Sequence, residues 1–142
     1  MVNKEDFEKE NVFGLGEKNP YGDYFIGQSY LNFLSKVDDI GLSLFNVTFE
    51  PGCRNNWHIH NASKGGGQIL ICTAGKGWYQ EDGKDAIMLT PGKVITIPAN
   101  VKHWHGAAKD SWFSHIAIEV PGEDTSTTWL EPVSDNYYNN LK

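Results

Sequence analysis

The chain has 142 residues, a length that suits one domain with a substantial buried core. Its 12 basic and 18 acidic residues give a formal net charge of -6, and the basic residues form no cluster, which excludes a typical nucleic-acid-binding surface. No apolar stretch approaches the roughly 18 residues of a membrane-spanning helix, and the first residues lack a signal peptide's apolar core, so we expect a cytoplasmic protein with no membrane partner.

Residues 1–41 are predicted to form an N-terminal arm that ends in an edge strand. The charged residues 4–11 suit a short helix, and glycines and a proline then break regular structure up to residue 22. Residues 24–34 are rich in aromatic and aliphatic side chains and are interrupted by Gly27, which is typical of a bent strand. An apolar edge strand favours pairing with a second copy, so we expect a homodimer or a higher homo-oligomer.

Residues 42–120 show the pattern of a β-barrel. Short β-forming segments are separated by turn pairs such as Pro51-Gly52 and Pro91-Gly92, at intervals of about ten residues. This pattern predicts an all-β domain, built as an antiparallel sandwich or barrel. The segment 61–67, with three consecutive glycines, is predicted to be an irregular loop. The strands are expected at residues 42–49, 68–73, 78–80, 86–89, 94–97 and 112–120.

Residues 121–142 differ in character from the barrel and are predicted to form a tail that packs on it. The tail begins with a polar run, continues with a short apolar piece around Trp129, and offers Ser134 as the cap of a helical turn. The two cysteines, Cys53 and Cys72, match no zinc motif in their spacing and are too few for a disulfide framework. We expect both to be reduced.

The histidines are concentrated in two short motifs. Of the 5 histidines in the chain, His58 and His60 form one pair, His103 and His105 form another, and His115 follows. Residues two apart on a strand share a face, so two such strands brought together aim up to four imidazoles at one point. Neutral imidazole is a common ligand of divalent transition metals, and the two pairs therefore predict a metal site. The pattern alone leaves the direction of His115 open, either into this cavity or into packed core.

The spacing of these motifs resembles that of the cupin superfamily. The residues that carry the resemblance are Gly52, His58, His60, Gln68 and Gly75 for the first cupin motif, and Gly92, Pro98 and His103 for the second. The resemblance covers residues 42–120 and implies a double-stranded β-helix, a jelly-roll-like barrel. It also implies that His58, His60, Gln68 and His103 bind one divalent metal ion. A four-histidine site, with His105 in place of Gln68, is the alternative.

Gln68 departs from the general cupin pattern in two ways. A glutamate is usual at this position, and the 7 residues between His60 and Gln68 make a longer gap than the motif normally has. An amide oxygen is a neutral ligand, so the site would hold one positive charge more than a site with three histidines and a glutamate. A metal ion in such a site is expected to be a stronger Lewis acid.

Several segments are similar to one group of single-domain cupins, the carboxymuconolactone decarboxylase-like cupins, which include the bacterial cupin hydroxynitrile lyases. These segments are residues 47–52, 57–60, 68–70, 73–75, 103–106 and 115–118. In that group three histidines and a glutamine hold the metal, which supports Gln68 as a ligand. The resemblance implies a divalent ion (Mn, Fe, Ni or Zn, with manganese favoured) and His105 and His115 as the catalytic residues.

Three classes of function are compatible with such a site. The first is a metal-dependent lyase or decarboxylase acting on a small hydroxy or oxo acid or a cyanohydrin-like compound, with histidine as acid and base. The second is an Fe(II) dioxygenase, and the third is a non-catalytic cupin that binds a metal or a small ligand. In each case the expected partner is a small molecule.

The aromatic and basic side chains near the motifs are assigned structural or solvated positions. Trp57, Trp78, Trp104 and Trp112 lie in the motif strands, where aromatic residues usually fill the core. Arg54, Lys64 and Lys102 could pair with an anionic substrate, but solvation is the expectation for all three.

Overall fold

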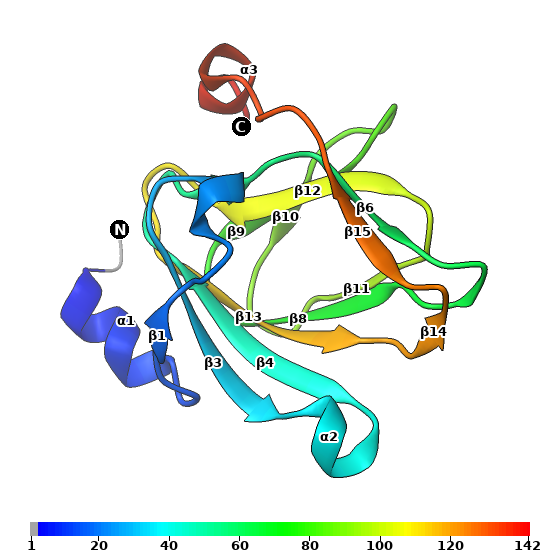
Figure 1. The fold of residues 1–142 in the computed structure, drawn as a ribbon. Helices are drawn as coiled ribbons and strands as arrows, with labels where there is room; N and C mark the ends of the chain where they lie inside the picture. The colour runs from blue at the N-terminus through cyan, green and yellow to red at the C-terminus, as the bar shows by residue number, and fades with distance from the viewer. Residues whose placement is uncertain (1–2) are drawn as a thin grey trace.

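The computed structural model describes residues 3–142 and shows a curled arrangement of antiparallel sheets (Figure 1). One sheet has the strand order β1-β3-β4-β13-β8-β11. Its strands are β1 (Glu17–Lys18), β3 (Ser29–Ser35), β4 (Ser43–Phe49), β13 (Phe113–Glu119), β8 (Gln68–Gly75) and β11 (Val94–Ile97). Two of its neighbouring pairs, β4 with β13 and β13 with β8, join distant parts of the chain, as expected for a jelly-roll-like barrel.

The second sheet faces the first and has the order β10-β9-β12-β5-β2. Its strands are β10 (Ile87–Leu89), β9 (Gly77–Glu81), β12 (Lys102–Ala107), β5 (Arg54–Asn55) and β2 (Phe25–Ile26). Strand β6 (His58–Asn61) pairs with β12 on one side and with β15 (Ser126–Trp129) on the other. The fold is therefore all-β, as predicted, and the two sheets enclose an interior space.

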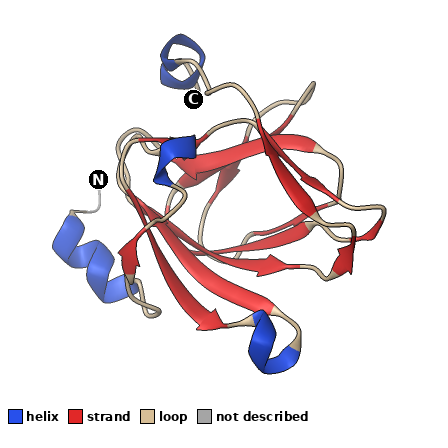
Figure 2. Cartoon of the chain, viewed as in Figure 1, coloured by secondary structure: helices blue, strands red, loops and turns tan. Residues whose placement is uncertain are grey.

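Helices are few and lie outside the sheets (Figure 2). The helices are α1 (Lys4–Glu10), α2 (Val37–Ile40) and α3 (Asp135–Asn139), with a 3₁₀ turn at Gly22–Tyr24. Asn3 caps α1 and Ser134 caps α3, because each side chain accepts a hydrogen bond from a backbone N–H of the first turn. None of the helices among residues 3–142 is long and apolar enough to cross a membrane.

The main core fills one part of the space between the sheets. Buried apolar side chains from both sheets meet there, among them Phe49, Leu70, Leu89, Ile97 and Phe113. Alternate residues of β8 are buried, so Gln68 shares the inward face with Leu70 and Cys72. The turn at Gly75 (φ +71°) does not form a hairpin, because it leads from β8 of the first sheet to β9 of the second. A side chain at this position would collide with the carbonyl oxygen of Trp112.

Two further clusters cover the outer faces of the sheets. Trp78 and Trp104 pack against Val133 and Tyr138 of the tail, and Trp57 lies against the same cluster. Trp112 packs with Phe7 of α1. The four tryptophans of the motif strands are therefore core residues, as predicted, and the tail packs on the barrel.

Three sequence predictions need correction. The segment 61–67 is not wholly irregular, because β7 (Lys64–Gly65) pairs with β14 (Gly122–Glu123). The polar run at 125–128 contains most of β15, which carries no alternating apolar pattern because its outer face is exposed. Arg54 is 4 % exposed rather than solvated, and its guanidinium donates to the carbonyl of Val133 and contacts the ring of Tyr138.

Candidate metal centre

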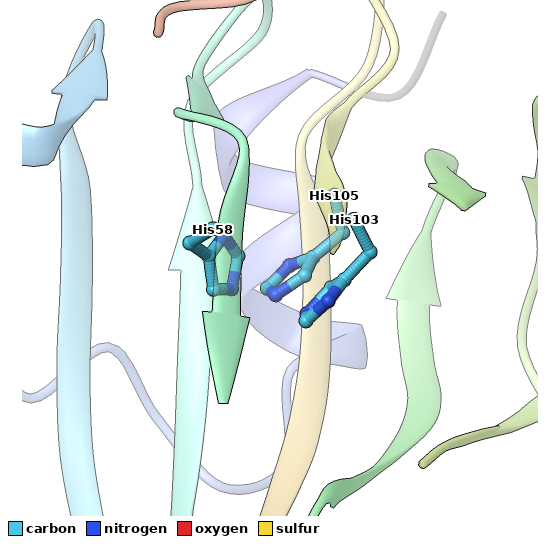
Figure 3. Close-up of side chains that lie close together, drawn as sticks. All are labelled: His58, His103 and His105. Carbon is cyan, nitrogen blue, oxygen red and sulfur yellow. The ribbon is translucent and has the colours of Figure 1, made fainter. Parts of the chain in front are cut away.

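Strands β6 and β12 bring the two histidine pairs together. The strands are antiparallel neighbours, and His58 is paired in register with His103. One ligand atom from each of His58, His103 and His105 lies within 4.8 Å of the others, and all three side chains are buried. Figure 3 shows their rings turned toward one another, His58 from β6 and the other two from β12. The chain therefore has a three-histidine site that can hold a metal ion.

His60 lies beside this cluster but is not one of the three histidines whose ligand atoms lie within 4.8 Å of one another. Its ring centroid is 5.0 Å from that of His58 and 5.2 Å from that of His103, while the His58 and His103 rings are 4.2 Å apart. Within the part of the chain that the structure describes, the buried Nε2 atom of His60 has no hydrogen-bond partner. The two His-x-His motifs thus converge, as the alternation of side chains along a strand predicts.

Backbone carbonyls fix the tautomers of two of these rings. Nδ1 of His58 lies 2.8 Å from the carbonyl oxygen of Asn56, and Nδ1 of His103 lies 2.9 Å from that of Val101. A carbonyl oxygen only accepts, so Nδ1 donates its hydrogen in both rings and Nε2 keeps its lone pair. A backbone acceptor on the far nitrogen is the usual arrangement behind a metal-binding imidazole.

Gln68 reaches the same space from the opposite sheet. Its Nε2 donates to Oε1 of Glu119 at 2.6 Å, and its buried Oε1 has no partner among residues 3–142. Burial lowers the pKa of His60, while the Glu119 carboxylate and the Gln68 side chain both act to raise it. Gln68 and Glu119 are therefore close enough to influence the ring of His60.

His105 is held by Asn55 rather than by a carbonyl. The backbone N–H of His105 donates to Asn55 Oδ1 at 2.9 Å, which identifies the other end of the amide as the donor. That Nδ2 atom lies 3.1 Å from Nε2 of His105 and 3.5 Å from Nδ1. The Nε2 lone pair is thus engaged by Asn55, unlike those of His60 and His103. Asn55 therefore engages a nitrogen of one of the three clustered histidines.

His115 points into the barrel, which settles the direction that the sequence left open. Its ring centroid lies 4.9 Å from that of His105 and 5.5 Å from that of Phe49. The side chain is fully buried, and neither ring nitrogen has a partner in the described chain. The register of β13 shifts between Ser114 and His115, so the strand is irregular where it presents this ring.

Burial keeps the interior imidazoles neutral. It lowers the pKa of His103 and of His115 to about 4, and it lowers the pKa of His58 and of His105 well below the usual value. Neighbouring imidazoles lower the pKa of His58 and of His105 further, because two adjacent rings resist being charged together. Neutral rings keep the lone pairs that metal binding and proton transfer require.

Four of the histidines, His58, His60, His105 and His115, line a cavity of about 350 Å³ between the sheets. Much of the remaining wall is apolar and aromatic, with Phe25, Phe45, Val47 and Trp129 among its members. Trp129 stacks on Tyr24 at 4.5 Å between ring centroids and lies 4.7 Å from the ring of His58. Strand β15 of the tail therefore supplies part of the cavity wall.

Sequence reasoning missed several polar or aromatic residues of this cavity, among them Asn55, Glu119 and Trp129. Asn55 and Trp129 carry no sequence signal, because only the pairing of β5 and β15 with distant strands brings them to the site. Glu119, in contrast, did carry a sequence signal. It follows His115 and Ala117 at two-residue spacing on β13, so it had to share their inward face once His115 did.

The residues present fit a divalent metal ion. In the described chain, the buried side-chain nitrogen and oxygen atoms without a hydrogen-bond partner all belong to His60, Gln68, His103 and His115. Such atoms are costly to bury unless something binds them. The barrel interior therefore holds several free imidazole lone pairs and one free amide oxygen, which a divalent metal ion could bind.

Comparison with known proteins agrees with this geometry. The family described as "Cupin domain" matches residues 45–118. The chain is 38% identical over 117 residues to a protein of Granulicella tundricola named (R)-mandelonitrile lyase, covering 82% of this chain and 86% of that one. It is also similar to the solved structure of a cupin-like protein from Thermotoga maritima, with a TM-score of 0.79, 40% identity, and coverage of 91% and 95% of the two chains.

A more distant structure shares the fold alone. A structure titled as a predicted oxalate decarboxylase from Thermotoga maritima matches with a TM-score of 0.65 at 14% identity, over 84% of this chain and 97% of that one. The family match, the relative at 38% identity and the barrel itself lead to one conclusion. The chain belongs to the cupin family.

Proposed function

We propose that this cupin is a metal-dependent lyase that cleaves a carbon–carbon bond next to a hydroxyl group in a small, uncharged molecule of the cyanohydrin type. The observation that carries the proposal is the convergence of unpaired imidazole nitrogens and the Gln68 amide oxygen on one largely apolar cavity. The relative named (R)-mandelonitrile lyase supports the reaction class.

The ligand set that we propose is His58, His60, Gln68 and His103, and the metal that we favour is manganese. Position supports this set, because the His58 ring lies 5.0 Å from that of His60 and 4.2 Å from that of His103, and the Gln68 side chain lies beside His60. When bound, a divalent metal ion supplies Lewis acidity that lowers the pKa of a substrate hydroxyl.

His105 and His115 are the groups that we assign to proton transfer. Both are buried and neutral, and their rings adjoin each other at 4.9 Å within the cavity wall. One imidazole takes the hydroxyl proton, the hydroxyl carbon becomes a carbonyl, and the electron pair of the breaking carbon–carbon bond leaves with the nitrile carbon. The resulting imidazolium returns its proton to that leaving group, which departs as hydrogen cyanide.

Apart from the metal ion, the cavity gives a carboxylic acid no positive charge to pair with, which favours a neutral substrate. Among the described residues that line it, the one side chain with a formal charge is that of Glu119, so no lysine or arginine is placed to pair with a carboxylate. Arg54 is committed elsewhere, to Val133 and Asp135 of the tail. The cyanohydrin-like part of the expected substrate range therefore fits better than the hydroxy-acid part.

The test is a matched pair of substrates given to manganese-loaded protein. An aromatic hydroxynitrile and the hydroxy acid with the same ring share the ring and the hydroxyl-bearing carbon, but only the acid is charged at neutral pH. We expect release of aldehyde and cyanide from the nitrile and no decarboxylation of the acid. Oxygen consumption by Fe(II)-loaded protein would instead favour a dioxygenase, and no turnover with either metal would favour a binding protein.

We also expect a homodimer, formed through the first sheet. Strand β3 pairs with β1 only at Tyr30 and Leu31, so its second half has a free edge within the described chain. Phe33 on that half is 48 % exposed, and nearby Ile40 of α2 is 75 % exposed. Light scattering should give twice the chain mass, and Ile40→Asp should reduce it to one chain mass if this edge is the interface.

A further inference from the structure

Gln68 and Glu119 form a cross-strand pair at the edge of the candidate site. They lie directly opposite each other in the antiparallel pairing of β8 with β13. Gln68 is 5 % exposed, whereas Glu119 is half-buried and lines the cavity. The distance from Gln68 Nε2 to Glu119 Oε1 is 2.6 Å, which is short for a hydrogen bond from an amide nitrogen.

This hydrogen bond has one possible direction. An ionised carboxylate has no hydrogen to donate, so the end of the amide that faces Glu119 must be the NH₂ group. The opposite end, Oε1, is then turned away from Glu119. That oxygen is buried without a partner in the described chain, beside the ring of His60.

We propose that Glu119 is a positioning residue that holds the Gln68 carboxamide with its oxygen, rather than its nitrogen, facing the histidines. The inference rests on the proposed ligand set, in which Gln68 Oε1 binds the metal. An amide that flipped would present two N–H donors to a cation, which cannot coordinate it. A glutamate ligand has no such requirement, because both of its carboxylate atoms are oxygens.

Glu119 also keeps a negative charge near the centre. Gln68 is neutral, but its partner places a carboxylate one strand away, close enough to offset part of the lowering of the His60 pKa that burial causes. A purely electrostatic role and a positioning role therefore both predict weaker metal binding when Glu119 is neutralised. The experiment must separate the two roles.

The experiment measures Mn²⁺ affinity by calorimetric titration of the chelator-treated full chain, in two backgrounds. In the natural background, Glu119→Gln keeps the size of the side chain but can donate as well as accept, so Gln68 is free to flip. We expect the Mn²⁺ dissociation constant to rise about 10- to 100-fold, the range seen when a partner of a metal ligand is lost. Glu119→Ala should weaken binding at least as much.

The second background is Gln68→Glu, where the orientation of residue 68 no longer matters. There, Glu119 can contribute its charge but has no amide to orient. We therefore expect Glu119→Gln to weaken Mn²⁺ binding much less in this background than in the natural one. A clear difference between the two backgrounds is the signature of positioning, whereas loss of charge alone weakens binding equally in both.

The controls separate failure of this inference from failure of the proposed ligand set. Glu123→Gln removes one exposed carboxylate from β14 and should leave Mn²⁺ affinity unchanged. If Gln68→Ala weakens binding but Glu119→Gln does not, the ligand set stands and the role of Glu119 is refuted. If Gln68→Ala has no effect, Gln68 is not a ligand and both fail. Equal weakening by Glu119→Gln in both backgrounds would also overturn the positioning role.

Discussion

Ser114 and His115 are neighbours on β13, yet they belong to two buried polar clusters on opposite faces of the same sheet. Ser114 Oγ lies within hydrogen-bonding distance of Asn46 Oδ1 (2.9 Å) and Thr48 Oγ1 (3.1 Å), under the N-terminal arm. His115 faces the barrel interior and has no partner among residues 3–142. Both side chains are fully buried.

The outer cluster, made of Asn11, Asn46, Thr48 and Ser114, satisfies its own polar atoms. Asn46 Nδ2 donates to Asn11 Oδ1 and to the carbonyl of Gly14, and Asn11 Nδ2 donates to Thr48 Oγ1. The inner cluster, made of the five histidines and Gln68, leaves several nitrogen and oxygen lone pairs free instead. The difference separates buried polar groups that stabilise the fold from groups kept available for a ligand.

The largest expected effect is on the inner cluster, where substitution of a ligand histidine and substitution of a catalytic histidine should have different consequences. His103→Ala should abolish stoichiometric metal in elemental analysis, because it removes a ring whose free Nε2 faces the site. His105→Ala should keep the metal and lower the lyase rate by about 10²- to 10⁴-fold. Retained metal in His103→Ala, or lost metal in His105→Ala, would break the proposed assignment.

On the outer cluster, Asn46→Ala should lower stability without touching the metal. It leaves Ser114 and Asn11 with fewer partners in a buried setting, so we expect the free energy of unfolding to fall by about 1–3 kcal/mol. Urea denaturation measures the change, and Asn136→Ala on the exposed face of α3 is the matched control. If Asn46→Ala also lost bound Mn²⁺, the two clusters would not be independent.

A smaller effect on stability, of opposite sign, is expected at His115. His115→Phe removes two unpaired buried nitrogens from a site already lined by Phe49 and Phe113, and should raise the free energy of unfolding by about 1 kcal/mol. The same variant should lose lyase activity while keeping the metal. If it unfolds as readily as Asn46→Ala, then His115 is a structural residue of the core.

The smallest expected effect concerns the wall of the cavity. Trp129→Leu removes the stack on Tyr24 and the contact with His58, so we expect KM for an aromatic hydroxynitrile to rise about 3- to 10-fold, from the free energy of one aromatic pair. Metal content should not change. An unchanged KM in steady-state assays would mean that the substrate ring binds against another part of the cavity wall.

The sequence predicted the β-strands and the face that each histidine pair shares, because both depend on local rules. Alternation fixes the shared face of His58 and His60, and turn pairs such as Pro51-Gly52 mark where strands end. The resemblance to cupins then supplied the pairing of distant strands, which no local rule contains.

What the sequence could not predict depends on pairing between distant segments. Strand β15 is polar because one face is solvent and the other contacts β6, so it shows no apolar alternation. Asn55 reaches His105 only through the pairing of β5 with β12. Arg54 looked like a solvated cation until the tail, some eighty residues later, covered it.

The most direct test is a crystal structure of the manganese-loaded protein with an anomalous difference map. We predict one strong peak per chain, at about 2.0–2.3 Å from Nε2 of His58, His60 and His103 and from Oε1 of Gln68. His115 should remain outside coordination distance. A peak bound by His105 in place of Gln68, or no peak between these rings, would contradict the account.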